Sequence, residues 1–118
     1  MTNGLVIEMD LARPQPQLPV FDWIVCLEVA EHIPRQYEAA FLANLHEHNR
    51  EGMILSWADE ITPVHVNTRT NQEVIAILAG LGYIHDAEAE AAARNVTAFW
   101  WLKRSLMVFR KATHARHR

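Results

Sequence analysis

Several residue types on which common functional classes depend are scarce in this sequence of 118 residues. Cys26 is the only cysteine, so an internal disulfide is excluded, and its apolar neighbours predict a buried thiol. No run reaches the ~18 apolar residues of a membrane span. The first ten residues have neither a basic start nor a small-residue cleavage site. We therefore expect a cytoplasmic protein without membrane attachment.

Glycine is also scarce, with four residues in all, and none belongs to a glycine-rich turn after an apolar strand. The only close pair, Gly80 and Gly82, follows a helical pattern and has no strand before it. This position excludes a phosphate-binding loop of the GxGxxG type in this stretch. A nucleotide-like ligand would have to be held by other residues.

Basic residues are few until the end of the sequence. Residues 1–102 contain all 14 acidic residues but only five of the 11 lysines and arginines. Such an acidic body disfavours binding to nucleic-acid phosphates. Residues 112–118 are basic and are predicted to form a disordered tail. Residues 1–111 are long enough for one domain with a single core.

Strand-like and helix-like segments alternate along the chain and predict an α/β fold with an open sheet. Residues 23–27 are continuously apolar, as is typical of a central strand. An amphipathic pattern predicts a helix over residues 35–49. Residues 70–73 match a capping box that begins another helix, and Gly82 suits its left-handed cap. Further strands are predicted at residues 5–9, 53–57, 83–85 and 106–109, the last one antiparallel, and further helices at residues 86–95, with Asp86 as the cap, and 99–103.

Residues 21–34, with the sequence FDWIVCLEVAEHIP, resemble one segment of class I S-adenosylmethionine-dependent methyltransferases. In that family an apolar fourth strand is followed by Glu-Val-x-Glu-His. The segment is similar to quinone-biosynthesis O-methyltransferases and small-RNA 2′-O-methyltransferases, and the similarity extends over residues 5–111. The resemblance implies a partial Rossmann-like sheet, mostly parallel with an antiparallel last strand, that lacks the family's first two strands. Residues 1–111 would then be a truncated methyltransferase domain.

The resemblance also implies S-adenosylmethionine as the cofactor. Asp10 matches the acidic residue that accepts a hydrogen bond from the adenine amino group, and Leu11 offers its backbone amide to the ring. Leu27 and Glu28, at the end of the next strand, are the other expected cofactor contacts. Apart from the resemblance, Asp10 is a residue that often begins a loop.

Glu28, Glu31 and His32 are spaced at i, i+3 and i+4, so they would converge on one side of a helical turn. Two carboxylates and an imidazole suit a divalent cation such as Mg²⁺ or Mn²⁺. In the families that the segment resembles, the same residue types bind metal, and His65 matches a fourth ligand in a later loop. The alternative from spacing alone is that Glu28 caps a helix, Glu31 is solvated and His32 packs against Pro34.

The mechanism implied by the resemblance gives roles to three residues in and beside that later loop. His65 could act as general base, Asn67 could orient the acceptor, and Trp57 could form a pocket wall, with core packing as the alternative for Trp57. The expected function is O-methylation of a small molecule with metal assistance.

Two alternative functions stay open. The first is a catalytically incomplete methyltransferase-like partner or regulatory protein, because another chain or a second copy could cover an exposed sheet edge. The second is an RNA 2′-O-methyltransferase, which the acidic body disfavours.

Overall fold

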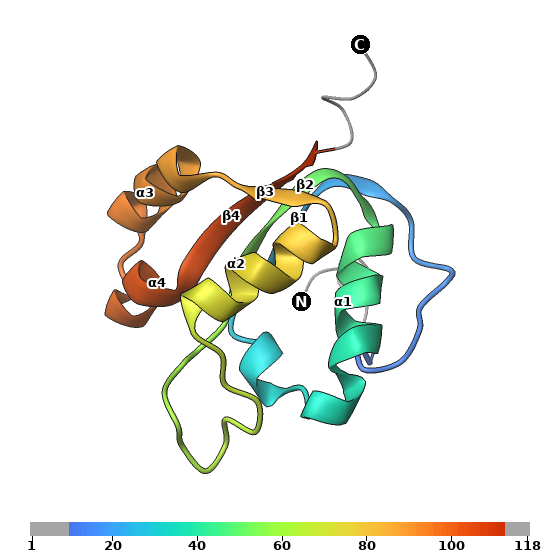
Figure 1. The fold of residues 1–118 in the computed structure, drawn as a ribbon, viewed down its shortest axis with the longest axis horizontal. Coiled ribbons are helices and arrows are strands. Elements are labelled where there is room, and N and C mark those ends of the chain that lie inside the picture. The colour runs from blue at the N-terminus through green and yellow to red at the C-terminus, as the bar shows by residue number, and fades with distance from the viewer. Residues whose placement is uncertain (1–9, 113–118) are drawn as a thin grey trace, which may run out of the picture.

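A computed structural model describes residues 10–112 and contains a four-stranded mixed sheet (Figure 1). The strands are β1 (Phe21–Cys26), β2 (Asn49–Ser56), β3 (Tyr83–His85) and β4 (Leu106–Lys111). Their order across the sheet is β1-β2-β4-β3. β1 and β2 are parallel, whereas β4 is antiparallel to both of its neighbours. Three strands therefore run one way and the last runs the other way, which confirms the predicted antiparallel last strand.

Helical segments connect these strands in the predicted alternation. The α-helices are α1 (Glu38–Glu47), α2 (Asn71–Gly80), α3 (Ala87–Val96) and α4 (Trp100–Ser105). Two 3₁₀ turns, η1 (Ala30–His32) and η2 (Arg35–Tyr37), come before α1. Thr70 and Glu73 form the predicted capping box, and Gly82 has the predicted left-handed backbone, with φ of 96°. Asp86 caps α3, as predicted. Within residues 10–112, no helix has the length and apolar character needed to cross a bilayer.

Most predicted boundaries shift by one or two residues in the structure, and two shift further. The helix predicted over residues 35–49 is α-helical only from Glu38 to Glu47, because a 3₁₀ turn follows Pro34. The strand predicted over residues 53–57 begins earlier, at Asn49, which pairs with Phe21 of β1. The first residues of β2 are polar, so no apolar run in the sequence marks this part of the strand. The strand predicted over residues 5–9 and the tail predicted beyond residue 112 lie outside the described residues.

The core lies on one face of the sheet, where α1 and α2 pack (Figure 1). Phe41 of α1 and Leu78 of α2 are fully buried with Met53 of β2 and Phe109 of β4. Alternate residues of a strand point to opposite faces. Val25, next to the core residue Cys26, is accordingly 64% exposed. Part of the second face of the sheet is thus open to solvent.

Cys26 belongs to the core and is 6% exposed, as the sequence predicts. Burial raises the pKa of its thiol, and the nearby negative charge of Glu31 raises it further, to about 12. The thiol is therefore protonated at neutral pH and acts as a small apolar side chain.

Gly52 is the position in β2 where neighbouring groups leave no room for a side chain. A Cβ atom there would lie 2.2 Å from the carbonyl oxygen of Phe109 and 2.7 Å from the ring of Trp23. We expect Gly52→Ala to lower the free energy of unfolding by about 3 kcal/mol, because a paired backbone carbonyl cannot move aside. Urea denaturation measures this change.

Gly80, in the last turn of α2, provides the matched control. A Cβ atom there meets nothing within 4 Å. Gly80→Ala should therefore raise the free energy of unfolding by up to about 1 kcal/mol, since alanine is the better helix former. Equal stability of the two variants would contradict the close pairing of β2 with β4.

Candidate active site

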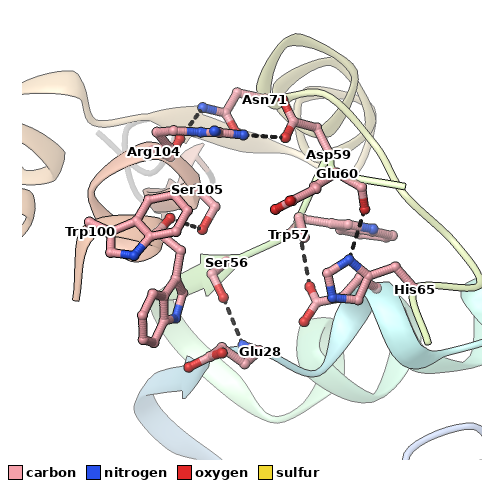
Figure 2. Close-up of a pocket in the computed structure, with 13 residues that line it drawn as sticks. Glu28, Ser56, Trp57, Asp59, Glu60, His65, Asn71, Trp100, Arg104 and Ser105 are labelled. Carbon is pink, nitrogen blue, oxygen red and sulfur yellow. Dashed lines mark hydrogen bonds and ion pairs between the residues drawn. The ribbon is translucent and has the colours of Figure 1, made fainter. Parts of the chain in front are cut away.

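A cavity of about 260 Å³ opens at the carboxyl ends of β1 and β2 (Figure 2). Parallel strands bring the segments that follow them to the same edge of the sheet, which is where open α/β sheets bind ligands. Here those segments are η1 and the β2–α2 loop, residues 57–70. Helix α4 forms the opposite wall. Residues of the lining include Glu28, Ser56, Trp57, His65, Trp101 and Arg104.

Glu31 of η1 lines this cavity and is only 3% exposed. Its Oε1 accepts a hydrogen bond from the backbone amide of Ala58 at 3.0 Å. Its backbone carbonyl accepts another from the amide of Asn67 at 3.1 Å. A buried carboxylate requires hydrogen-bond donors to offset the loss of hydration. Both bonds hold the β2–α2 loop against η1.

Two imidazoles face Glu31. Nδ1 of His32 lies 2.9 Å from the carbonyl oxygen of Val64, and Nδ1 of His65 lies 2.8 Å from that of Glu60. A carbonyl oxygen can only accept, so each Nδ1 donates, and in the neutral imidazole this leaves the lone pair on Nε2. Nε2 of His32 lies 3.6 Å from Oε2 of Glu31. The ring centroids are 5.2 Å apart in an edge-on arrangement. One ligand atom each from Glu31, His32 and His65 lies within 4.8 Å of the others.

These three residues, the metal-type group, suit a divalent transition metal. An ion ~2.0 to 2.3 Å from each ligand atom requires separations of up to ~4.6 Å, so small side-chain rotations are sufficient. Two imidazoles and one carboxylate favour Mn²⁺ over Mg²⁺, which prefers oxygen ligands. Hydrogen bonds from Nδ1 to backbone carbonyls are also the arrangement that orients metal-binding histidines.

Glu28 lies outside the metal-type group, although its spacing predicts that it converges with Glu31 and His32. The backbone of Glu28 is left-handed, with φ of 61°, and the helical turn begins only at Ala30. The amide of Glu28 donates to Oγ of Ser56 at 2.7 Å, and the residue lines the cavity (Figure 2). Left-handed backbone at a residue other than glycine is strained and concentrates at functional sites.

Asn67 and Trp57, which we expected to contact the acceptor, are both buried. The side-chain amide of Asn67 is bonded to Arg35 and Glu38 and lies outside the cavity lining. Trp57 does border the cavity, but its Nε1 donates to the carbonyl of Asn67 at 2.8 Å and its ring packs edge-on against Phe41. Trp57 is therefore both a core residue and part of the cavity wall.

Glu38 of α1 is a residue of this region that the sequence does not mark. Its two carboxylate oxygens accept hydrogen bonds from Arg69 at 2.8 and 3.0 Å. Burial raises the pKa of Glu38, but hydrogen bonds from Arg69 and Asn67 and the charges of Arg69 and Arg35 outweigh burial, so the pKa lies below 4.5. Glu38 and Arg69 are 31 residues apart, so no local pattern in the sequence could identify the pair.

The expected cofactor contacts lie beside β1. Leu11 and Leu27 line one groove of about 330 Å³ along this strand. Asp10 is exposed, and its carboxylate accepts from the amide of Ala12 at 2.9 Å and from Nε of Arg13 at 3.2 Å. These local bonds are those of a residue that begins a loop. Glu28 borders the neighbouring cavity rather than this groove.

Helix α4 supplies the wall opposite the metal-type group. Trp100 and Trp101 make an edge-on contact with each other and are 61% and 38% exposed. Arg104 donates to Asp59 at 2.7 Å, and its carbonyl accepts from Asn71 (Figure 2). These bonds attach α4 to the start of the β2–α2 loop and to the first residue of α2. The tryptophans therefore border the cavity instead of filling the core.

No protein-family profile and no curated protein matches this sequence. Two solved structures of magnesium protoporphyrin IX methyltransferase from Synechocystis PCC 6803 are similar in fold. One has bound S-adenosylmethionine, with 22% identity and a TM-score of 0.58, and one has bound S-adenosylhomocysteine, with 19% identity and a TM-score of 0.59. Each match covers 87% of this chain, but 43% and 48% of the solved chains. The chain thus spans less than half the length of these methyltransferases and has a partial class I methyltransferase fold.

Proposed function

We propose that this chain is an S-adenosylmethionine-dependent methyltransferase, or a segment of one, that methylates an oxygen atom of a small molecule with help from a divalent metal. One observation carries the proposal: the metal-type group lies at a cavity at the carboxyl ends of parallel strands in a class I methyltransferase fold. Ligands bind at this edge of open α/β sheets. The solved methyltransferase with bound S-adenosylmethionine supports this cofactor for the chain.

Glu31, His32 and His65 would hold the metal through one carboxylate oxygen and two Nε2 atoms. When bound, a cation lowers the pKa of an acceptor hydroxyl, and S-adenosylmethionine supplies the methyl group. Nε2 of His65 cannot bind a cation and accept a proton at the same time, and Nδ1 of His65 is occupied by the carbonyl of Glu60. We therefore assign His65 to metal binding rather than to general-base catalysis.

The charge of the cavity favours a small acceptor over RNA. Glu28, Glu31, Asp59 and Glu60 all line it, against the single basic residue Arg104. Asp59 already pairs with that arginine. Phosphate groups would therefore be repelled. The exposed tryptophan rings of α4 add flat apolar surface, which is typical of small-molecule sites.

The open edge of β1 favours a second candidate function, that of a catalytically incomplete methyltransferase-like partner. Phe21 and Val25 of this strand are 53% and 64% exposed, and no strand within residues 10–112 pairs with its free edge. Such an edge is a template for strand addition. In either function, further polypeptide or a second copy would cover it.

We expect the isolated chain to bind S-adenosylmethionine weakly, with a Kd in the millimolar range, equivalent to about −4 kcal/mol. The groove at Leu11 and Leu27 offers contacts for one end of the cofactor, but the sequence has no glycine-rich turn for the other end. Calorimetric titration with and without Mn²⁺ measures the affinity. A micromolar Kd, about −8 kcal/mol, would contradict this expectation. No binding at millimolar cofactor would favour the partner function.

Glu31→Gln should weaken Mn²⁺ binding by more than about tenfold, because it removes the only carboxylate of the metal-type group. The glutamine oxygen can still accept from Ala58, so the fold should be retained. The electron paramagnetic resonance signal of free Mn²⁺ measures the affinity, and circular dichroism checks the fold.

Glu28→Gln is the matched control, since it makes the same change at the same cavity but outside the metal-type group. It should leave the Mn²⁺ affinity unchanged. If both variants lost affinity equally, the negative charge of the cavity and not ligation by Glu31 would explain binding. An unchanged affinity in Glu31→Gln would remove Glu31 from the ligand set.

A further inference from the structure

We infer that Asn67 is a positioning residue that holds the β2–α2 loop so that His65 faces Glu31 and His32. The importance of this role for metal binding rests on the proposed function. The mechanism implied by the resemblance predicts that Asn67 could orient the acceptor, but its side chain lies outside the cavity lining. Its contacts instead tie the loop to three other parts of the structure.

All of the backbone and side-chain polar groups of Asn67 are bonded, and the residue is 2% exposed. Its amide donates to the carbonyl of Glu31 on η1 at 3.1 Å, and its carbonyl accepts from Nε1 of Trp57 at 2.8 Å. Its Oδ1 accepts from Nε of Arg35 on η2 at 2.6 Å, and its Nδ2 donates to Glu38 on α1 at 2.9 Å. One residue thus joins the loop to η1, η2 and α1.

The orientation of the Asn67 side chain is fixed by charge. A guanidinium faces its oxygen and a carboxylate faces its nitrogen, and both bonds are charge-assisted. If the amide were rotated by 180°, its NH₂ group would face the donor Nε of Arg35. Its oxygen would then face the acceptor carboxylate of Glu38. Arg69 binds the same carboxylate through two bonds and so keeps Glu38 in place. The side chain therefore has one stable orientation.

Asn67 acts on His65 because only one residue separates them. Its backbone amide, bonded to the Glu31 carbonyl, sets the distance between this part of the loop and η1, where His32 also lies. The side-chain bonds to Arg35 and Glu38 keep that amide in place. His32 contributes a second link through the carbonyl of Val64, the residue before His65. If Asn67 no longer held the loop, His65 would move relative to the other two members of the metal-type group.

The test compares Asn67→Ala with Asn44→Ala. Asn44 is also an asparagine with 3% exposure, and its side chain makes three hydrogen bonds, to the backbone of Leu11, Arg13 and Gln15. Both variants should lower the urea midpoint, since each leaves buried polar groups without partners. Only Asn67→Ala should also weaken Mn²⁺ binding, by about tenfold or more, as loss of outer-shell support does. Equal Mn²⁺ affinities in the two variants would overturn the inference.

Arg35→Met provides a milder variant if Asn67→Ala does not fold. The Arg35 side chain is 57% exposed, so the fold should tolerate this change, while Oδ1 of Asn67 and the carbonyl of the neighbouring Thr68 lose their donor. A measurable loss of Mn²⁺ affinity relative to Asn44→Ala supports the inference. An affinity equal to that of the parent would overturn it.

A readout without metal separates this inference from the proposed function. In the parent chain, nuclear magnetic resonance should detect a proton contact between the rings of His32 and His65, whose centroids are 5.2 Å apart. The contact should persist in Asn44→Ala and disappear in Asn67→Ala, or weaken in Arg35→Met. A contact as intense as in the parent, in either the Asn67 or the Arg35 variant, would overturn the inference. A parent chain that shows the contact but binds no Mn²⁺ would instead contradict the metal-assisted function.

Discussion

Burial of the Glu31 carboxylate constrains the whole end of the structure that contains the candidate site. A charged group at 3% exposure is stable only when donors replace its lost water. The amide of Ala58, two residues after β2 ends, supplies one of them. The hydrogen bond from Ala58 to Glu31 holds the start of the β2–α2 loop against η1. The ends of two parallel strands, both following segments and both histidines therefore meet at one place.

The same contacts stabilise the fold and shape the site. Helix α1 buries Phe41 and Leu45 against the sheet, and this packing places Glu38 beside the β2–α2 loop. Glu38 then fixes Asn67 and Arg69 by hydrogen bonds. The position of the loop thus depends on core packing at a distance from the cavity. A stability-matched control is necessary for any variant here, because weaker metal binding could otherwise reflect partial unfolding.

Local signals in the sequence were sufficient for much of the fold. The capping box at Thr70 and Glu73 and the left-handed Gly82 depend on neighbouring residues only, and both were predicted. The position of Glu28 differs from the prediction, because the i, i+3, i+4 spacing brings side chains together only if a helical turn starts at this residue. The chain instead passes through a left-handed conformation before η1 begins. No property of residues 28–32 alone distinguishes these two paths.

The arrangement around the β2–α2 loop was beyond the reach of sequence patterns for a different reason. Asn67 contacts Arg35 and Glu38 across separations of 32 and 29 residues. Such contacts depend on how helices pack, and helical periodicity predicts only which face is apolar. The role of orienting the acceptor therefore comes to Asn67 only from the mechanism that the resemblance implies. The proximity of His65 to η1 likewise came from the resemblance, because spacing alone cannot relate two loops.

The open edge of β1 links cofactor binding to association. Phe21 and Val25 are exposed, and they line the same groove as Leu11 and Leu27. Any polypeptide that covers this edge therefore also becomes a wall of the groove in which we expect the cofactor. The two binding events would then share a coupling free energy, and coupling is reciprocal. A covering segment that raises the affinity for S-adenosylmethionine must itself bind more tightly, by the same factor, when the cofactor is present.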